Sequence, residues 1–347
     1  MKYKILEALK NNPGNFISGE SLSTQLGVTR TMVWKYIKDL RTQGYVIHSS
    51  SGKGYKLEYT PDILNAFEIR YGLSTKYLGS EIHFLKTIDS TNLYAKKIAN
   101  EGCKDGALVV AETQTSGKGR MGRTWESKNK KGIWMSIVLK PEILPSHIQI
   151  ITLAASVAVV HGIKKATGIS TGIKWPNDII SDGKKVCGIL TEMSSEPDRV
   201  NYIVLGIGIN VNHDNDDFSD EIRHKATSLK ILKYSDGDTH DEHDDEYTDE
   251  YSDEDIRKND VIKAILAEFE GLYENIKNGE TDVVLNQWRE ASLTLGMEVK
   301  IISGNCEFWG TALDITDDGK LIVRDTNDLI HELVSGEISI RGMDGYT

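Results

Sequence analysis

Cysteine is scarce in this 347-residue sequence, which contains three widely separated residues of that type, Cys103, Cys187 and Cys306. An odd and scattered set argues against a disulfide framework or a paired-cysteine zinc site, and favours a reducing compartment. Long apolar runs are also missing, since none approaches the roughly 18 to 20 residues that a membrane-spanning helix needs. Residues 1–14 are amphipathic and lack the apolar stretch and the small-residue cleavage site of a secretory leader. We therefore expect a cytoplasmic globular protein that has no membrane partner.

Lysine and arginine are absent from residues 236–255, although this stretch contains 12 Asp and Glu residues. Removing those 12 negative charges from the net charge of -11 leaves +1 for the rest of the chain. Like charges at that density repel and few apolar side chains are available for burial, so residues 235–257 are predicted to form a disordered acidic insertion. Two alternatives stay open: His240 and His243 chelate a cation together with the carboxylates, or the insertion competes with nucleic acid for a basic part of the chain.

The first 60 residues are basic, with 9 Lys and Arg against 4 Asp and Glu. Apolar residues at helical spacing predict three short helices near 2–11, 18–26 and 29–43, and the alternating stretch 45–57 predicts a β-hairpin. This order is typical of a winged helix-turn-helix, whose third helix enters the major groove of DNA. A small helical module for protein contact is the alternative. The side chains expected to contact DNA lie on the third helix and at the wing tip: Arg30, Thr31, Lys35, Lys38 and Lys53.

The whole chain is predicted to be an α+β multidomain protein, with the winged helix in residues 1–60 and a linker at 61–78. Residues 79–292 mix strands and helices, and residues 293–347 contain short alternating runs typical of a small antiparallel barrel. The strands expected in the central domain are 82–88, 108–112, 133–139, 172–175, 185–193 and 202–210. The helices expected there are 90–100, 148–168, 260–278 and 281–291.

The richest segment for chemistry is Gly117-Lys-Gly-Arg-Met-Gly-Arg-Thr-Trp125, in which glycines alternate with Lys118, Arg120 and Arg123. Backbone amides and cations on such a loop can converge on one anion. The spacing fits neither a P-loop nor a dinucleotide-binding loop. A flexible hairpin tip is the bland alternative, and Trp125 is either a core residue or a platform for a purine.

Two further polar segments lie at predicted strand ends. In Lys174-Trp-Pro-Asn-Asp178 the proline cannot continue ladder pairing, so Asn177 and Asp178 are expected at the end of a strand. There they could hold ribose, a triphosphate-bound Mg²⁺ or only the turn. Lys185 begins an apolar strand, where an ammonium group can neutralise a carboxylate or a phosphate. A solvated strand end is the alternative for that lysine.

Glycine alternates with aliphatic residues in Leu205-Gly-Ile-Gly-Ile-Asn210, which permits either a flat ligand against the backbone or close helix packing. Asp89-Ser-Thr-Asn92 follows a strand and begins a helix, either as an N-cap alone or as a set of ligands for a polar uncharged group. No Ser-His-Asp order, H-E-x-x-H motif or reactive cysteine signature occurs. The residues therefore indicate a site for a nucleotide and a small carboxylate, without a protein nucleophile.

These five segments, in this order, resemble the biotin–protein ligase family, and the flanking modules resemble its bifunctional branch, the biotin operon repressors. The family loop G-R-G-R-x-G-R-x-W corresponds to residues 117–125, and the family motif K-W-P-N-D is complete at 174–178. The motifs K-x-x-G-I-L, G-x-G-I-N and D-S-T-N fall at 185–190, 206–210 and 89–92. The ending Gly336-Glu-Ile-Ser-Ile-Arg341 is also similar to the family's, whose last domain is an SH3-like barrel.

The resemblance implies an ATP-dependent ligase that activates biotin as biotinyl-5'-AMP and transfers it to one lysine of a biotin carboxyl carrier protein domain. It also implies Mg²⁺ bound with ATP, a homodimer when the adenylate is present, and a palindromic operator for which the adenylate is the corepressor. Two alternatives remain: a biotin-sensing transcription factor without ligase activity, and a lipoate-type acyl ligase. The polar Ser90-Thr-Asn92 and Gln114 favour the ureido ring of biotin over an apolar dithiolane.

By position, the resemblance assigns biotin to Ser90, Thr91, Asn92, Gln114, Lys118, Gly119, Arg120, Lys185, Gly188, Gly206 and Gly208. It assigns the nucleotide to Arg120, Arg123, Trp125, Lys174, Asn177 and Asn210, and catalysis to Lys185, Arg120 and Arg123. Asp178 is expected near the Mg²⁺ that ATP brings. Lys118 stands where the family has arginine. A lysine at this position keeps the backbone contact but cannot make a bidentate side-chain contact.

Overall fold

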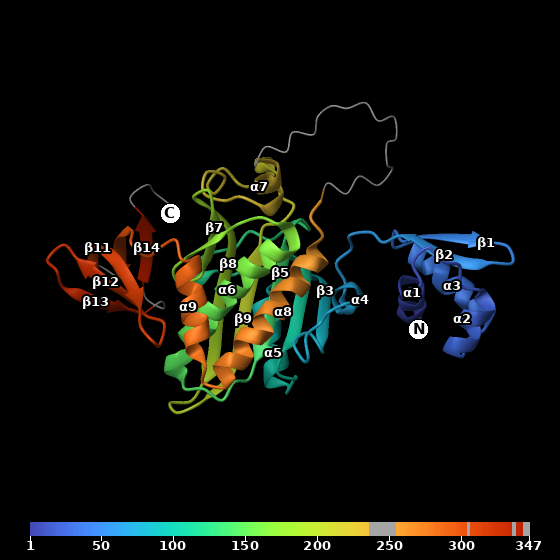
Figure 1. Ribbon diagram of the computed structural model, residues 1–347, viewed down its shortest axis with the longest axis horizontal. Coiled ribbons are helices and arrows are strands. Elements are labelled where there is room, and N and C mark those ends of the chain that lie inside the picture. The colour runs from blue at the N-terminus through green and yellow to red at the C-terminus, as the bar shows by residue number, and fades with distance from the viewer. Residues whose placement is uncertain (236–254, 304–305, 335–337, 343–347) are drawn as a thin grey trace. The chain divides into compact units, whose positions relative to one another are not determined.

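The computed structural model describes residues 1–235, 255–303, 306–334 and 338–342. The chain forms two compact units, Met1–Tyr71 and Gly72–Thr347 (Figure 1). The acidic insertion predicted at 235–257, with His240 and His243, lies almost entirely outside the described residues, so its predicted disorder stays a prediction.

The first unit is a winged helix-turn-helix, as predicted. Helices α1 (Lys2–Lys10), α2 (Gly19–Leu26) and α3 (Arg30–Arg41) precede the hairpin of β1 (Val46–Ser50) and β2 (Gly54–Tyr59). The hydroxyl oxygen of Thr29 caps α3 by accepting a hydrogen bond from Met32 N at 3.2 Å. The apolar stripes of the helices form one buried core: Ile5, Leu6, Leu9, Leu22, Val33, Ile37, Leu40, Tyr45 and Ile47.

The wing depends on a glycine at the start of β2. Gly54 has φ +107°, and a Cβ there would lie 2.6 Å from the carbonyl carbon of Ile17. The close approach lets Ile17 pair with Tyr55, through Ile17 N to Tyr55 O at 2.8 Å and Tyr55 N to Ile17 O at 2.9 Å. The short segment at Ile17, just before α2, thus pairs with β2 and fixes the wing against the helices.

The segment predicted as a linker at 61–78 is divided between the two units at Tyr71. A short helix, α4 (Ala66–Arg70), joins the first unit through Glu68, which is buried. The Glu68 carboxylate pairs with Lys10 Nζ at 2.7 Å and accepts a hydrogen bond from the Tyr45 hydroxyl at 2.7 Å. Burial and this carboxylate raise the pKa of Tyr45. A buried charge with two partners shows that this part of the segment belongs to the folded unit.

A seven-stranded mixed sheet forms the centre of the second unit, with strand order β3-β4-β5-β9-β8-β7-β6. Strands β3 and β4 are parallel, joined through helix α5 (Thr91–Asn100), and the other neighbours are antiparallel. The strands are β3 (Ile82–Ile88), β4 (Ala107–Gln114), β5 (Ile133–Leu139), β6 (Gly172–Lys174), β7 (Asp178–Ser181), β8 (Lys184–Ser195) and β9 (Val200–Ile209). This arrangement confirms the mixed α/β prediction.

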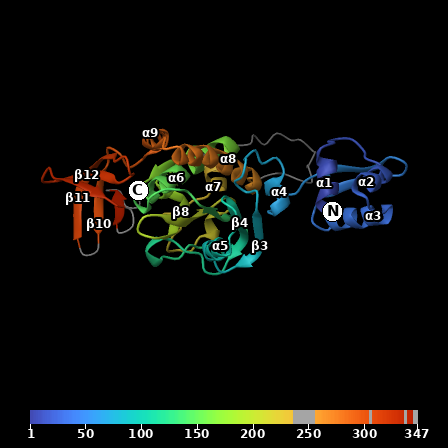
Figure 2. The same cartoon turned by 90° about the horizontal axis from the view of Figure 1, so that it is seen from below.

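Helices cover both faces of the sheet. Figure 2 shows α5 on one side and α6 (Ile148–Thr167), α8 (Lys258–Lys277) and α9 (Thr281–Ala291) on the other. Helix α5 buries Ala95 and Ile98 against Val109, Val138 and Val204 of the sheet. The short helix α7 (Leu229–Ser235) precedes the acidic insertion.

Among the described residues, one segment, Pro145–Thr167, is long and apolar enough to cross a membrane, so the prediction that no apolar stretch approaches that length was wrong. Most of it is buried between the sheet and α8, where a Cβ on Gly162 would lie 2.8 Å from Ile265 N. Its apolar composition therefore serves helix packing in the core.

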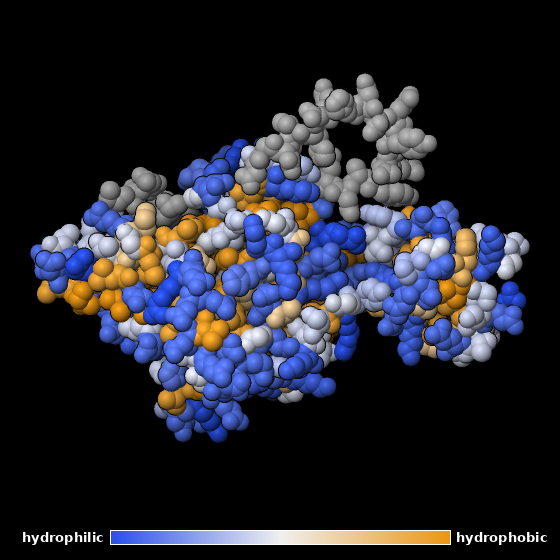
Figure 3. All heavy atoms as spheres, in the orientation of Figure 1, coloured by the Kyte–Doolittle hydropathy of each residue, from blue (hydrophilic) through white to orange (hydrophobic). Residues whose placement is uncertain are grey.

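The C-terminal part is a small antiparallel sheet, as predicted, with strand order β13-β12-β11-β10-β14. Its strands are β10 (Glu298–Ser303), β11 (Cys306–Ile315), β12 (Leu321–Asp325), β13 (Ile330–Leu333) and β14 (Ile338–Gly342). Figure 3 shows apolar side chains gathered on its surface, and Leu313, Leu329 and Ile330 are exposed there.

Candidate active site

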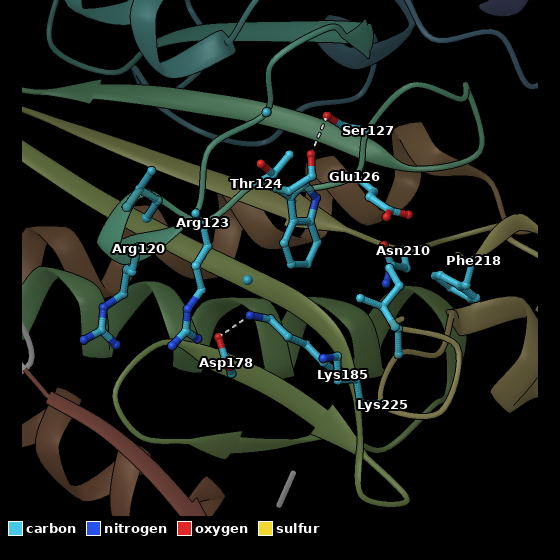
Figure 4. A pocket seen from close by; sticks show the side chains of 18 of the residues that line it. Arg120, Arg123, Thr124, Glu126, Ser127, Asp178, Lys185, Asn210, Phe218 and Lys225 are labelled. Carbon is cyan, nitrogen blue, oxygen red and sulfur yellow. Dashed lines mark hydrogen bonds and ion pairs between the residues drawn. The ribbon is translucent and has the colours of Figure 1, made fainter. Parts of the chain in front are cut away.

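The five predicted segments meet in one open cleft with a volume of about 2190 Å³, between the glycine-rich loop and the sheet (Figure 4). All the predicted biotin, nucleotide and metal residues line it: Ser90, Thr91, Asn92, Gln114, Lys118, Gly119, Arg120, Arg123, Trp125, Lys174, Asn177, Asp178, Lys185, Gly188, Gly206, Gly208 and Asn210. The convergence is a structural fact, whereas the role of each residue stays a prediction.

An uncharged hydrogen-bond network lies at the start of α5. Gln114 Oε1 accepts hydrogen bonds from Thr91 N at 2.8 Å and Thr91 Oγ1 at 3.1 Å. Gln114 Nε2 donates to Ser127 Oγ at 3.1 Å. These side chains and Ser90 are buried, so their remaining donors and acceptors favour a polar uncharged ligand.

Asn92 is held from both sides. Its Oδ1 lies 2.6 Å from the hydroxyl oxygen of Ser136, and its Nδ2 donates to Glu192 Oε2 at 2.8 Å. Lys96 Nζ pairs with the other carboxylate oxygen of Glu192 at 2.6 Å. Ser127 and Ser136, which lie outside the predicted motifs, thus complete the uncharged network, and the ion-paired Glu192 holds Asn92 from outside it. Ser136 could have been recognised in the sequence, because it is a polar residue within the apolar strand β5, all of which is buried.

The glycine-rich loop is a hydrogen-bonded hairpin. Lys118 pairs with Thr124, and Gly119 N donates to Arg123 O at 2.7 Å. A Cβ on Gly117 would lie 2.5 Å from both Ser127 Oγ and Trp125 O, so only glycine fits at the base of the hairpin. The alternative of a flexible hairpin tip does not match this hydrogen-bonded loop.

Arg120 lies at the tip of the hairpin and reaches across the cleft. Its Nη1 donates to Asn177 Oδ1 at 2.7 Å, and Asn177 Nδ2 donates to Ile189 O at 2.6 Å. Burial lowers the pKa of Arg120, and Asp178 opposes that shift. Asn177 thus fixes an arginine in the cleft, which is a different contact from the predicted one with the nucleotide. Lys174, in the paired strand, is also buried at the cleft wall.

Lys185 and Asp178 form an ion pair at 2.6 Å, with each side chain 19% exposed. In Figure 4 Arg120 and Arg123 extend in the same direction from the loop, on the side where Asp178 and Lys185 meet. The Lys185 backbone is held by its neighbours, through Lys185 N to Lys225 O at 2.9 Å and Thr227 N to Lys185 O at 3.0 Å. A third cation therefore has a fixed place beside the two arginines.

The described part of the chain contains no group of three or more His, Cys, Asp or Glu side chains that could hold a metal ion. Asp178, the residue predicted near Mg²⁺, directs a carboxylate oxygen to Lys185. These donors do not form a protein-built Mg²⁺ site, and Mg²⁺ usually keeps several waters and substrate phosphates as ligands.

Trp125 covers the glycine surface of β8 and β9. A Cβ on Gly188 would lie 2.9 Å from the indole ring, and a Cβ on Gly208 would lie 2.6 Å from Nε1. Lys185 Nζ lies 5.1 Å from the centroid of the same ring, which is a cation–π contact. Trp125 Nε1 is buried and has no hydrogen-bond partner among the described residues. The indole therefore occupies the surface predicted for the acyl chain of biotin, rather than an open stacking position.

Residues 213–228, which were not among the predicted site segments, close one side of the cleft. Asn210 Nδ2 donates to Thr227 O at 3.0 Å, and Ser219 Oγ donates to Glu126 Oε1 at 2.7 Å. His213 and Phe218 are buried here with stacked rings 5.3 Å apart. The segment has no periodic apolar pattern, so only its contacts reveal its place.

His213 makes the stability of this region depend on pH. Burial lowers the pKa of His213 to about 4, so the folded chain stays unprotonated where the unfolded chain binds a proton. Stability is therefore full above the ordinary value near 6.5 and is lost as pH falls toward 4, by about 3 kcal/mol in all. We expect His213→Gln to be less stable at pH 7 but to lose about 3 kcal/mol less over that range. Denaturant unfolding at several pH values measures this, and equal slopes for both proteins would contradict it.

A winged helix-turn-helix unit, a mixed sheet with a glycine-rich cationic cleft and a small C-terminal sheet together define a ligase of the biotin and lipoate type. Residues 84–210 match the model of the biotin/lipoate A/B protein ligase family, residues 2–56 match an HTH domain, and residues 294–341 match the biotin protein ligase C-terminal domain.

The bifunctional ligase/repressor BirA of Bacillus spizizenii is 40% identical over 98% of this chain and 98% of its own length. That of Escherichia coli is 27% identical over 98% of this chain and 97% of its own length. The biotin protein ligase of Aquifex aeolicus, solved in complex with biotin and ATP, is 26% identical, has a TM-score of 0.61 and aligns over 76% of this chain and 99% of its own. The chain belongs to the biotin–protein ligase family, in its bifunctional ligase/repressor branch.

Proposed function

We propose that this chain joins biotin and ATP into biotinyl-5'-adenylate and then transfers the biotinyl group to a lysine of a carrier protein domain. The observation that carries this proposal is the meeting, in one cleft, of an uncharged buried network with three cations, Arg120, Arg123 and Lys185. Membership of the family and the Aquifex aeolicus structure with biotin and ATP support both substrates.

The first half-reaction forms an anhydride between two anions. A carboxylate oxygen of biotin attacks the α-phosphorus of ATP, and the bond from that phosphorus to pyrophosphate breaks. The negative charge on the carboxylate and the phosphates opposes this approach, so fixed cations in a partly dehydrated cleft lower the barrier. Arg120 is held by its hydrogen bond to Asn177. Lys185 is held by its ion pair with Asp178, and both cations are suited to this role because little reorganisation is needed.

The second half-reaction needs no protein nucleophile. The unprotonated amine of the carrier lysine attacks the acyl carbon, AMP leaves with the former bridging oxygen, and the amine loses its proton. Lys185 stabilises the departing phosphate, and Arg123 supplies a further positive charge on the same side of the cleft. Mg²⁺ arrives with the triphosphate and offsets its charge, held largely by phosphate oxygens and water.

The proposed biotin contacts are those of the polar network and the glycine surface. Thr91, Asn92 and Gln114 hold the ureido ring, whereas the acyl chain lies against Gly188 and Gly208 once the Trp125 indole has left them. The displaced indole then offers its ring to adenine.

Intact-mass measurement of a purified carrier domain tests the ligase activity. Incubation with the full chain, biotin and MgATP should increase the carrier mass by one biotinyl group, while a carrier with the target lysine changed to arginine stays unmodified. A parallel reaction with lipoate distinguishes the related acyl ligase. An unmodified carrier in the presence of biotin would contradict the proposal.

A second function, biotin-responsive repression, is favoured by the exposed basic face of α3. Arg30, Thr31, Lys35 and Lys38 are all exposed on this helix, and Lys53 is exposed at the wing tip. The adenylate acts as corepressor by favouring a homodimer that presents two winged helices to a palindromic operator.

The dimer hypothesis predicts a ligand-dependent association. We expect the dimer dissociation constant to fall at least tenfold when biotin and MgATP are supplied together, because the adenylate binds the dimer more tightly than the monomer. Sedimentation equilibrium over a range of protein concentrations measures this constant. The same constant with and without the two substrates would remove corepression by dimerisation.

A further inference from the structure

Helix α3 carries a large aromatic side chain on its solvent-exposed face. Val33, Ile37 and Leu40 point into the core of the winged-helix unit, whereas Trp34 is 55% exposed. Trp34 is absent from the cluster of buried and partly buried apolar residues that holds this unit together. The stability of the unit therefore gives no reason for an indole at this position.

Trp34 lies within the basic face of the helix. Thr31, Trp34, Lys35 and Lys38 are spaced by three, one and three residues, so they share one side of α3, and all are exposed. Lys38 Nζ lies 5.6 Å from the centroid of the indole ring. The exposed indole therefore lies beside a cation that can bind a phosphate, and it presents its flat apolar surface on the helix.

We propose that Trp34 reads thymine in the operator by packing its indole on the C5-methyl group in the major groove. The inference rests on the proposed DNA-binding function and names what one residue contributes to it. Positive charge fits the phosphate backbone and carries no sequence information by itself. The thymine methyl is the apolar group that base pairs display in the major groove, and an exposed indole on the recognition helix matches it in chemistry.

A second exposed aromatic of the same unit supplies an internal control. Phe16 is 37% exposed and lies near Lys53 and Lys56, with their Nζ atoms 6.0 and 5.8 Å from its ring centroid. Phe16 precedes α2 and is not on α3. It therefore shares the aromatic and lysine character of Trp34 but not its place on the helix that enters the groove.

The test uses the full chain with biotin and MgATP, and duplexes selected from a random pool. In the best-bound duplex each thymine is replaced in turn by deoxyuridine, which removes only the methyl group. For the wild-type chain we expect one or two positions at which this replacement weakens binding about tenfold. Trp34→Ala should bind the thymine duplex about tenfold more weakly and should no longer distinguish thymine from uracil at those positions.

Three variants separate the role of Trp34 from other effects. Phe16→Ala and Lys38→Ala should keep the wild-type thymine-to-uracil ratio, and Lys38→Ala should also lower the salt slope of binding by about one. Trp34→Phe should restore part of the discrimination if Trp34→Ala folds poorly. An unchanged thymine-to-uracil ratio in Trp34→Ala, or no sensitive thymine for the wild-type chain, would overturn the proposal. If no duplex is enriched at all, the DNA-binding function itself fails, and this inference fails with it.

Discussion

Replacing Lys185 by alanine is expected to lower the rate of biotin transfer to the carrier about 1000-fold, close to loss of activity. The substitution removes the cation that forms an ion pair with Asp178, 2.6 Å away. Without Lys185, the Asp178 carboxylate lies in a cleft that must accept the biotin carboxylate and the ATP phosphates. Repulsion between Asp178 and these anions then adds to the loss of their attraction to Lys185. Initial rates of carrier labelling at saturating biotin and ATP measure the effect.

Two comparisons decide why the activity falls. Lys185→Ala combined with Asp178→Asn should recover part of the rate, because the carboxylate that lost its ion pair with Lys185 is then gone. Lys118→Ala, which changes a loop cation whose predicted contact is through its backbone, should keep most of the activity. Thermal unfolding of the winged-helix unit should be unchanged in all three proteins. A wild-type labelling rate in Lys185→Ala would show that the catalytic assignment is wrong.

Adding one methyl group at Gly206 is expected to weaken biotin binding about 100-fold, the cost of roughly two disrupted hydrogen bonds in a buried site. A Cβ there would overlap Asn92 Oδ1 and lie 2.9 Å from Asn92 Cγ. Asn92 cannot give way without breaking its contacts with Ser136 and Glu192. Gly206→Ala therefore displaces Asn92, the side chain proposed to hold the ureido ring.

Calorimetric titration with biotin measures this loss, and Gly271→Ala is the matched control. Gly271 lies in α8, and a Cβ there would meet nothing within 4 Å. That variant should bind biotin as the wild-type chain does and should be slightly more stable, because alanine favours a helix interior. Equal biotin affinity in Gly206→Ala and in the wild-type chain would contradict the proposed place of the ureido ring.

Local patterns were sufficient for most of the fold. Helix α9 and strands β3 and β5 have the predicted bounds, because apolar periodicity and glycine or polar ends mark them clearly. The segment at 174–178 was predicted as a strand end, whereas the structure pairs Lys174 with Asp178 in the hairpin of β6 and β7. Proline interrupts the ladder there, as expected, but only the structure shows that the chain turns back.

The site was predicted as a list of residues but not as a network. The motifs brought the predicted residues to the cleft, yet Ser136 and Glu192 meet Asn92 across 44 and 100 residues of chain. Periodicity does not reveal which side chains meet over such distances. The position of Trp125 on Gly188 and Gly208 was likewise unexpected, because a motif gives residue types and not the state of a loop.

Fixed cations are proposed to hold a free acyl adenylate in the cleft without a covalent enzyme intermediate. Native and denaturing mass spectrometry of the chain, incubated with biotin and MgATP but no carrier, tests this proposal most directly. We expect a native complex heavier by one biotinyl-5'-adenylate, an unmodified chain after denaturation, and loss of the bound adenylate in Arg120→Ala. A biotinyl group that stays attached to the denatured chain, or a native complex that never contains the adenylate, would contradict it.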